Sequence, residues 1–231
     1  MSAGRDRGVA PLRPVVSERD RAKRLIGAIY SGAADKLYEP IVVRTAFPLF
    51  GGDLNDLVLE HGRRAVVAAS GRPILDMPIG TAYFTLALAK RHEGVVVGCD
   101  IAGGMVRKAR SAALESDVDN LVAVQADAHN LPFEKGSFGA ILCTNGLQVI
   151  PGLHRSVSEL TRVLAPGGRL YVSTVTLPLG AILPEHTAER LPTLFKSRRE
   201  LVRAFNDKAL EVTSVRSNRF ALLIEATKKT S

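Results

Sequence analysis

The chain has 231 residues, of which 46% are hydrophobic and 23% charged, as expected for one globular α/β domain with a small addition. Its apolar runs are far shorter than the roughly 20 residues of a membrane helix, and its first residues lack the apolar segment of a secretory signal, so a cytoplasmic location is expected. The formal net charge is +8, but there is no Trp and aromatic residues make up only 5%. Because basic side chains are not interleaved with aromatic rings, the composition argues against a nucleic-acid partner.

Two segments are expected to precede the main domain. Residues 1–16 contain two prolines and three arginines and predict a flexible basic arm. Residues 17–71 predict an N-terminal helical cap, with one helix beginning after Ser17, a suitable N-cap, and others over 33–46 and 53–70.

From residue 72 onward, short apolar runs alternate with amphipathic stretches. Strands are predicted at residues 74–77, 95–100, 121–125, 139–144, 169–175, 210–216 and 220–226, and helices at 81–91, 103–114, 154–164 and 197–206. This alternation predicts a doubly wound α/β sheet with five parallel strands. The link between the last two strands is too short to cross over, so the sheet is expected to end in a C-terminal antiparallel hairpin. The domain would span residues 72–231, with an insertion at 177–207.

The first predicted strand leads through a tight turn, Asp76 to Ala82, straight into a helix. Such a turn lets a ligand approach the backbone beside the positive end of a helix dipole. Asp100 ends the second strand, 24 residues after Asp76. An acid at about this distance accepts hydrogen bonds from a ribose diol in nucleotide-binding sheets, although it could instead cap the helix that follows.

Four segments in this order resemble the class I S-adenosylmethionine-dependent methyltransferases, in the small-molecule branch that includes the ubiquinone and menaquinone C-methyltransferases. The segments are ILDMPIGTAYFTLALA, GCDIAGGMVRKAR, VQADAHNLPFEKGSFGAILCTNGLQVIP and SVSELTRVLAPGGRLYVSTV. They fall within residues 74–175, about 100 of the 231 residues. The resemblance implies a Rossmann-like fold, S-adenosylmethionine as the cofactor and methyl transfer to a small acceptor.

The same resemblance assigns residues to the cofactor. They are Asp76, Ile79, Gly80, Thr81, Asp100, Ile101, Asp127, Ala128 and Asn145. The first four would surround the amino-acid part of the cofactor, and the next two would hold the ribose and flank the adenine. Asp127 and Ala128 would read the adenine edge, and Asn145, with Gly146 and Gln148, would face the sulfonium and the substrate.

Three positions depart from the family pattern. Pro78 and Ala82 replace the outer glycines of the first loop, so that one N–H group is lost and one methyl group is added where the helix meets the strand. Gly139 stands where relatives commonly carry Asp, at a position that is usually structural.

The catalytic residues are not fixed by the sequence, and the candidates are Gln148, His154 and His129. By resemblance, Gln148 occupies a position where relatives often carry His, but an amide cannot act as a general base. No metal is expected, because none of the five histidines forms a ligand-spaced pair. Cys99 and Cys143 lie on strands separated by a third, roughly 9.5 Å apart, too far for a disulfide.

The insertion after the fifth strand is the one segment whose sequence bears on the methyl acceptor. It is apolar but rich in proline. It is either ordinary core packing or a lid that presents Leu183 and Phe195 to an apolar or aromatic acceptor. Tyr30 and Tyr38, in the N-terminal helices, similarly either line the site or belong to the core.

Two alternatives to a small-molecule methyltransferase remain. One is a cofactor-binding protein without transferase activity, in which the changed first loop reflects relaxed catalytic demand. The other is an RNA methyltransferase that uses the basic arm, although the fourth strand leads to Cys-Thr-Asn-Gly rather than to the Asn/Asp-Pro-Pro-Tyr/Phe motif of base-amine methylation. The oligomeric state is left open.

Overall fold

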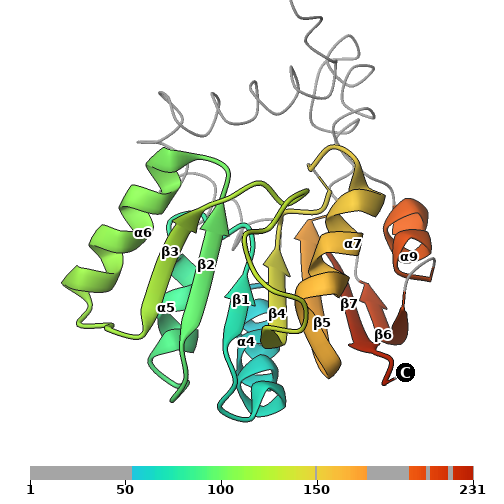
Figure 1. The fold of residues 1–231 in the computed structure, drawn as a ribbon, viewed down its shortest axis with the longest axis horizontal. Helices are drawn as coiled ribbons and strands as arrows, with labels where there is room; N and C mark the ends of the chain where they lie inside the picture. Colours follow the sequence, from blue (N-terminus) through green and yellow to red (C-terminus); the bar gives the residue numbers. More distant parts are fainter. Residues whose placement is uncertain (1–53, 149, 176–197, 207–208, 218–220, 231) are drawn as a thin grey trace, which may run out of the picture.

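The computed structural model describes residues 54–148, 150–175, 198–206, 209–217 and 221–230. The strands are β1 (Ile74–Asp76), β2 (Val96–Asp100), β3 (Leu121–Gln125), β4 (Phe138–Thr144), β5 (Leu164–Val175), β6 (Leu210–Ser217) and β7 (Ala221–Lys228). The helices are α4 (Leu54–Ala69), α5 (Tyr83–Ala89), α6 (Gly103–Glu115), α7 (Leu153–Val163) and α9 (Arg198–Asn206). Figure 1 shows that they cover both faces of one twisted sheet.

The sheet has the strand order β3-β2-β1-β4-β5-β7-β6. β1 pairs in parallel with β2 on one side and β4 on the other, with Ile74 opposite both Val96 and Ala140. β2–β3 and β4–β5 are also parallel, whereas β7 is antiparallel to both β5 and β6. The five parallel strands and the antiparallel pair predicted from the sequence are therefore confirmed. The order reverses at β1 and β4, and ligands of open α/β sheets bind beyond the carboxyl ends of strands at such a switch point.

Most predicted boundaries are within two residues of those observed, and the differences at α5 and β5 have a clear structural cause. The helix expected over 81–91 begins at Tyr83 and ends at Ala89, because Ala82 adopts a left-handed conformation with φ 65° and cannot continue the helix backward. β5 begins at Leu164 instead of residue 169, because Phe138 pairs with Leu164 before the register shifts and the ladder resumes at Arg169.

Burial explains why the elements stack in three layers. Figure 1 shows α7 in front of the sheet and α4 and α5 behind it. The front core joins α7 and α9 to β4 through residues such as Leu160, Phe205 and Ile141, all fully buried. The rear core includes Leu88 and Tyr171. A fully buried Leu or Phe side chain contributes about 1.5–3 kcal/mol relative to an exposed one, so both layers hold the sheet in place.

α4 confirms the helix predicted over 53–70, and it packs directly on β1, β4 and β5. The predictions for the arm at residues 1–16, for the remainder of the cap up to residue 53 and for Tyr30 and Tyr38 lie outside the described residues. The same is true of Leu183, Phe195 and most of the insertion. In the described part of the chain, no helix combines the length and the hydrophobicity that a membrane crossing requires.

A buried polar network fixes α4 to the far half of the sheet. Glu225 on β7 is 2% exposed and forms ion pairs with Arg64 on α4 and, at 3.7 Å, with Arg216 on β6. His61 of α4 lies beside the same carboxylate, with Nδ1 2.9 Å from Ser173 Oγ and Nε2 3.6 Å from Glu225 Oε1. Burial, reinforced by the two arginines, lowers the pKa of His61 from 6.5 to about 4. At neutral pH the imidazole is therefore uncharged, and the two arginines balance the buried carboxylate.

Candidate functional site

The loop between β1 and α5 lies at the switch point and is tied to both neighbouring strands. The Met77 N–H donates to the Leu142 carbonyl of β4 at 3.0 Å, and the Ile79 N–H donates to the Cys99 carbonyl of β2 at 2.8 Å. The peptide bond from Met77 to Pro78 is cis. These contacts hold the loop across the carboxyl ends of three adjacent strands.

Two glycines provide the space that this loop occupies. A Cβ atom on Gly98 would lie 1.9 Å from Ile79 Cδ1, and one on Gly146 would lie 2.2 Å from Pro78 Cδ. Pro78, one of the departures from the family pattern, therefore packs against the backbone of Gly146. Gly98 was missed by sequence reasoning, although a glycine inside a Val-rich strand is a known signal of close backbone approach.

This packing makes a testable prediction. Gly146→Ala is expected to destabilise the protein by about 1–3 kcal/mol, because the added methyl group overlaps the proline ring and the loop must shift. In a Pro78→Gly background the same substitution should cost much less, since the overlapping atoms are gone. Thermal unfolding of the wild-type protein, the two single variants and the double variant measures the coupling between Gly146 and Pro78. Equal costs of Gly146→Ala in both backgrounds would contradict the proposed contact.

Asp100 binds the loop to the start of α6. Its carboxylate is 8% exposed and accepts hydrogen bonds from the Gly80 N–H at 3.0 Å and the Ala102 N–H at 2.9 Å. Burial raises the pKa of Asp100, and these hydrogen bonds oppose the rise. The N-cap position of α6 is taken by Ala102, so Asp100 lies two residues before the N-cap. A carboxylate has about four lone-pair sites, so Asp100 can still accept from a ligand hydroxyl group.

Asp76 carries the clearest sign of a missing partner. The side chain is 5% exposed, and Oδ2 accepts from the Thr85 hydroxyl at 2.5 Å. Oδ1 is buried and has no hydrogen-bond partner among the described residues. Burial is the largest cause that raises the pKa of Asp76 from 3.8 to about 7, and the nearby Asp100 adds to it. An unpaired buried acceptor is rare in folded proteins and fits a ligand that supplies the donor, in this case a cationic one.

The third predicted cofactor segment follows β3. Asp127 Oδ1 accepts from the His129 N–H at 2.9 Å and lies 3.3 Å from His129 Nδ1. Ala128 and the His129 side chain are buried, at 6% and 3% exposed. His129 is thus held beside Asp127 at the β3 side of the site, while His154 is exposed in the first turn of α7.

The segment after β4 supplies the remaining predicted residues. Asn145 has a left-handed conformation with φ 53°, and its N–H donates to the Ser173 carbonyl at 2.7 Å. Gln148 is 5% exposed, and its carbonyl oxygen Oε1 finds no hydrogen-bond partner within the described part of the chain. The structure therefore leaves a second unpaired buried acceptor in the segment that leaves the switch point.

Neither cysteine nor metal chemistry is indicated in the described ranges. Cys99 and Cys143 are buried free thiols, and burial raises the pKa of each to about 12, so neither is a ready nucleophile. No cluster of three or more potential metal-ligating side chains occurs among the described residues.

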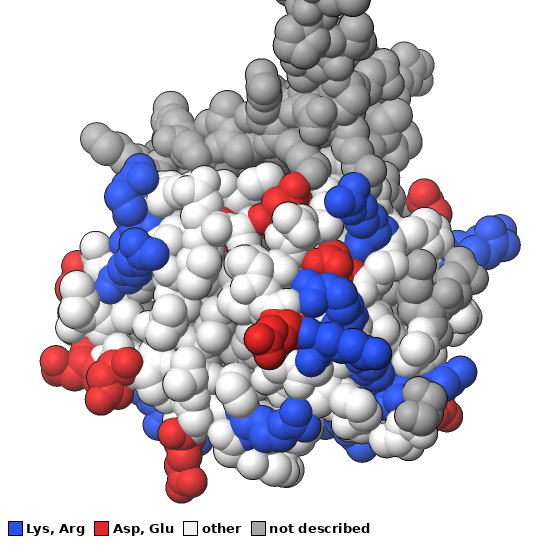
Figure 2. Space-filling model, viewed as in Figure 1, with Lys and Arg blue, Asp and Glu red and all other residues white. Residues whose placement is uncertain are grey.

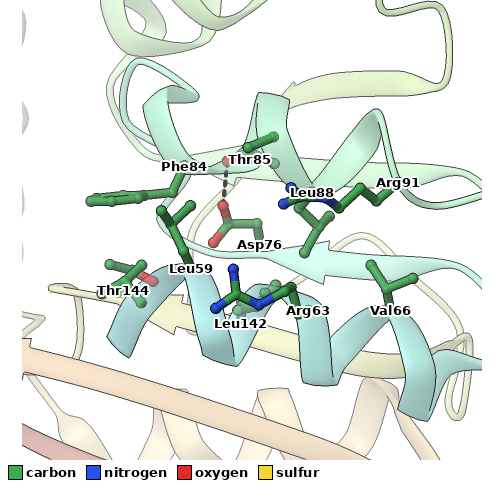
Figure 3. A pocket seen from close by; sticks show the side chains of 13 residues that line it. Leu59, Arg63, Val66, Asp76, Phe84, Thr85, Leu88, Arg91, Leu142 and Thr144 are labelled. Atoms are coloured by element: carbon green, nitrogen blue, oxygen red, sulfur yellow. Dashed lines mark hydrogen bonds between the residues drawn. The ribbon is translucent and has the colours of Figure 1, made fainter. Parts of the chain in front are cut away.

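A pocket opens between α4 and α5, above β1 and β4 (Figure 3). Its charged lining residues are Asp76, Arg63 and Arg91, its hydroxyl groups come from Thr85 and Thr144, and the other lining residues are apolar or glycine. Sequence reasoning missed the contribution of α4, because the spacing of Glu60 and Arg63 is that of an ordinary ion pair on a helix surface.

The acidic side chains at the carboxyl edge of the sheet have the opposite sign to the net charge of the chain. Asp76 and Asp100 place two buried carboxylates at the switch point of a protein with net charge +8. Figure 2 shows one run of basic side chains on the right half of the face that carries α7, with acidic side chains beside it. The site itself therefore favours a ligand with positive charge. A doubly wound sheet of this strand order, with carboxylates and a tight loop at its switch point, is the arrangement that the resemblance to class I methyltransferases implied.

Comparisons with known proteins agree with this class. Residues 74–168 match the methyltransferase domain family. The demethylmenaquinone methyltransferase of Corynebacterium glutamicum (strain R) is 31% identical over 179 residues, 71% of this chain and 74% of the relative. The chain therefore belongs to the class I S-adenosylmethionine-dependent methyltransferases, and S-adenosylmethionine is its cofactor.

Solved structures share the fold at low sequence identity. The geranyl diphosphate C-methyltransferase from Streptomyces coelicolor A3(2), in complex with Mg2+, geranyl diphosphate and S-adenosyl-L-homocysteine, has a TM-score of 0.63 and 17% identity, covering 75% of this chain and 79% of that chain. The [4+2]-cyclase SpnF has a TM-score of 0.65 and 18% identity, covering 76% and 81%. These two neighbours have different activities in their names although they share one fold. The fold therefore does not identify the methyl acceptor, which has to be argued from the site.

Proposed function

We propose that the chain transfers the methyl group of S-adenosylmethionine to a small aromatic, quinone-like acceptor that carries a hydroxyl group. The observation that supports the hydroxyl group is the buried Oε1 of Gln148, which has no hydrogen-bond partner among the described residues. An acceptor hydroxyl that donates to this oxygen would satisfy it. The ring type is supported by the similarity to demethylmenaquinone methyltransferase over 71% of the chain.

The cofactor is proposed to lie across the ends of β1 to β4. The ribose hydroxyls would donate to Asp100, and the α-ammonium group would donate to the open oxygen of Asp76. The adenine would lie between Ile101 and the Asp127–Ala128 segment, with the Asp127 carboxylate accepting from its amino group. The residues that complete this set are Ile79, Gly80, Thr81 and Asn145, of which the first three form the loop around the amino-acid part.

The proposed reaction demands alignment more than acid–base chemistry. The bound cofactor supplies a methyl group on a sulfonium, which is already a good leaving group. The chain's own contribution is to hold the acceptor in line and to exclude water. Gln148 orients the acceptor by a hydrogen bond and takes no proton. His129 lies beside Asp127 and His154 is exposed, so we assign neither of them a proton-transfer step.

We further propose that the protein acts in the cytoplasm on small molecules and does not act on nucleic acid. The support for a small acceptor is the family membership, and the interspersed acidic side chains in Figure 2 do not favour a nucleic-acid track on that face. The test is transfer of labelled methyl to a panel of demethylated quinols, simple phenols and short RNA. Labelling of the aromatic acceptors is expected; labelling of RNA alone would overturn the proposal.

Asp100→Ala should weaken the binding of S-adenosyl-L-homocysteine by about tenfold to a hundredfold, the value of a hydrogen bond to a charged group. Because Asp100 also holds Gly80 and Ala102, the variant is compared with Asp100→Asn, which keeps the shape and one acceptor and should lose less. Calorimetry gives the affinities and thermal unfolding shows that both variants are folded. An unchanged affinity in folded Asp100→Ala would remove this residue from the site.

A further inference from the structure

One margin of the sheet is formed by β3, which pairs with β2 and with no other strand of the described part of the chain. α6 packs along β3 and runs in the opposite direction, so that Gly103 at the start of α6 lies beside Gln125 at the end of β3. Figure 1 shows this margin on the left of the molecule. We refer to residues 103–125 as the α6–β3 edge.

Exposed apolar side chains gather at the α6–β3 edge. Within the described ranges, five large hydrophobic side chains are exposed, and three of them lie at or beside this edge. Leu114 on α6 is 80% exposed, Val122 on β3 is 48% exposed, and Val95, just before β2, is 45% exposed. Val97 is the register partner of Val122, and Val95 lies on the same face of the sheet as Val97. Grouped apolar side chains on a surface are typical of a contact with another molecule.

The charges of the α6–β3 edge are divided between its two ends. Arg107 and Lys108 lie in the first half of α6, whereas Glu115, Asp117 and Asp119 lie at or just after its end. Figure 2, in the same view as Figure 1, shows basic side chains toward the upper left of the molecule and acidic ones toward the lower left. This edge therefore has a positive end and a negative end, although the chain as a whole carries a net charge of +8.

Arg110 prevents β3 from pairing with a further strand at its centre. The Nε and Nη2 groups of Arg110 both donate to the Ala123 carbonyl of β3, at 3.0 and 2.7 Å. A charged side chain over an edge strand is a common feature that prevents the addition of another strand. A partner at this edge would therefore bind through side chains and would not extend the sheet.

We propose that the α6–β3 edge is the interface of a two-fold symmetric dimer of this chain. A two-fold axis perpendicular to α6 places the positive end of one copy against the negative end of the other. The apolar side chains of both copies, Leu114 and Val122, then lie within one contact. An isologous interface requires a surface that is complementary to itself, and an edge with one positive and one negative end has this property. The site at the switch point stays open, because β2 separates β1 from this edge.

Sedimentation equilibrium of the full chain over a range of concentrations tests the dimer. Leu114→Lys should weaken dimerisation at least about tenfold, because it places a cation at the most exposed apolar contact. The matched control is Val67→Lys, which adds the same charge at a 78% exposed position of α4 and should dimerise as the wild type does. Both side chains are largely exposed, so both variants are expected to fold, and thermal unfolding verifies this.

Two results of this experiment would overturn the proposal. One is a wild-type chain that stays monomeric up to a concentration of about 1 mM. The other is a dimer that Leu114→Lys weakens no more than Val67→Lys does, since the interface would then lie elsewhere.

Charge reversal tests the orientation of the two copies. Arg107→Glu introduces a negative charge at the positive end, and the double variant Glu115→Lys/Asp119→Lys introduces positive charges at the negative end. Each protein alone should dimerise at least about tenfold more weakly than the wild type, because like charges then meet. An equimolar mixture of the two should regain most of the wild-type association, because each altered end meets an end of opposite sign. A mixture that associates no more tightly than its two components would overturn the proposed interface.

Discussion

Asp76→Asn is expected to stabilise the ligand-free protein at alkaline pH and to weaken cofactor binding. The pKa of Asp76 is raised to about 7 from 3.8 mainly by burial, so the folded state holds its proton over a pH range in which the unfolded state has lost it. A group with a raised folded pKa favours folding below the unfolded pKa, and this advantage is lost as the pH rises through the folded pKa. Ionised Asp76 is therefore a cost to the ligand-free fold above pH 7.

The asparagine removes this cost because it cannot ionise, while its oxygen can still accept from Thr85. The gain in unfolding free energy should be close to zero below pH 4, grow through pH 7 and level off at about 2–4 kcal/mol above pH 8. Denaturant unfolding at pH 4, 6 and 8 measures it. A gain that is the same at all three pH values would mean that Asp76 does not titrate in this range.

Whereas Asp76→Asn should stabilise the ligand-free fold, the same substitution should weaken cofactor binding. The wild-type affinity for S-adenosylmethionine is expected to fall up to about tenfold per pH unit below pH 7, because the proposed contact with the ligand ammonium requires ionised Asp76. The affinity of Asp76→Asn should be about tenfold to a hundredfold lower than the wild-type value at pH 8 and should vary little with pH through this group. A residue retained at a cost to stability because it binds ligand is a common stability–function trade-off.

Much of the fold could be predicted because its signals are local. β4 reads as a continuous apolar run, FGAILCT, which is typical of a strand buried on both faces. The three residues between β6 and β7 exclude a crossover, so their antiparallel pairing follows from chain length alone. The sequence does not reveal that β7 enters between β5 and β6, because adjacency along the chain does not say which strand of a hairpin faces the sheet.

The candidate site also contains some residues that the sequence predicts and others that it does not. Asp76, Asp100 and Asp127 each end or follow a predicted strand, and the carboxyl ends of neighbouring parallel strands meet at one edge. That Arg63 and Arg91 line one pocket could not be predicted, because a charged residue on a helix or just after one needs no special explanation in a sequence. The pocket depends on α4 and α5 lying side by side, which only the tertiary structure shows.

The network around Glu225 has a sequence signal that went unused. A single Glu within the apolar strand ALLIEATK predicts a buried carboxylate that needs a partner. The partners Arg64 and His61 lie more than 160 residues away on α4, and nothing in the local pattern identifies them. Long-range charge pairs of this kind need the structure.

Arg64→Met should therefore destabilise the protein by about 2–4 kcal/mol, because among the described residues it leaves the Glu225 side chain, 3% exposed, with the more distant Arg216 as its one remaining cationic partner. For a chain of this size the melting temperature should fall by roughly 5–15 °C. The matched control is Arg63→Met, one residue away, which breaks only an exposed pair and should cost no more than about 1 kcal/mol.

A second substitution tests why Arg64→Met loses stability. In the Arg64→Met background, Glu225→Gln should recover most of the lost stability, because the buried group then carries no charge that needs balancing. The same change in the wild-type protein should stabilise little or destabilise, since it leaves Arg64 and Arg216 without their carboxylate. Thermal unfolding of the four proteins completes the cycle. Purely additive effects would mean that Arg64 stabilises α4 by packing its aliphatic stem and not by neutralising Glu225.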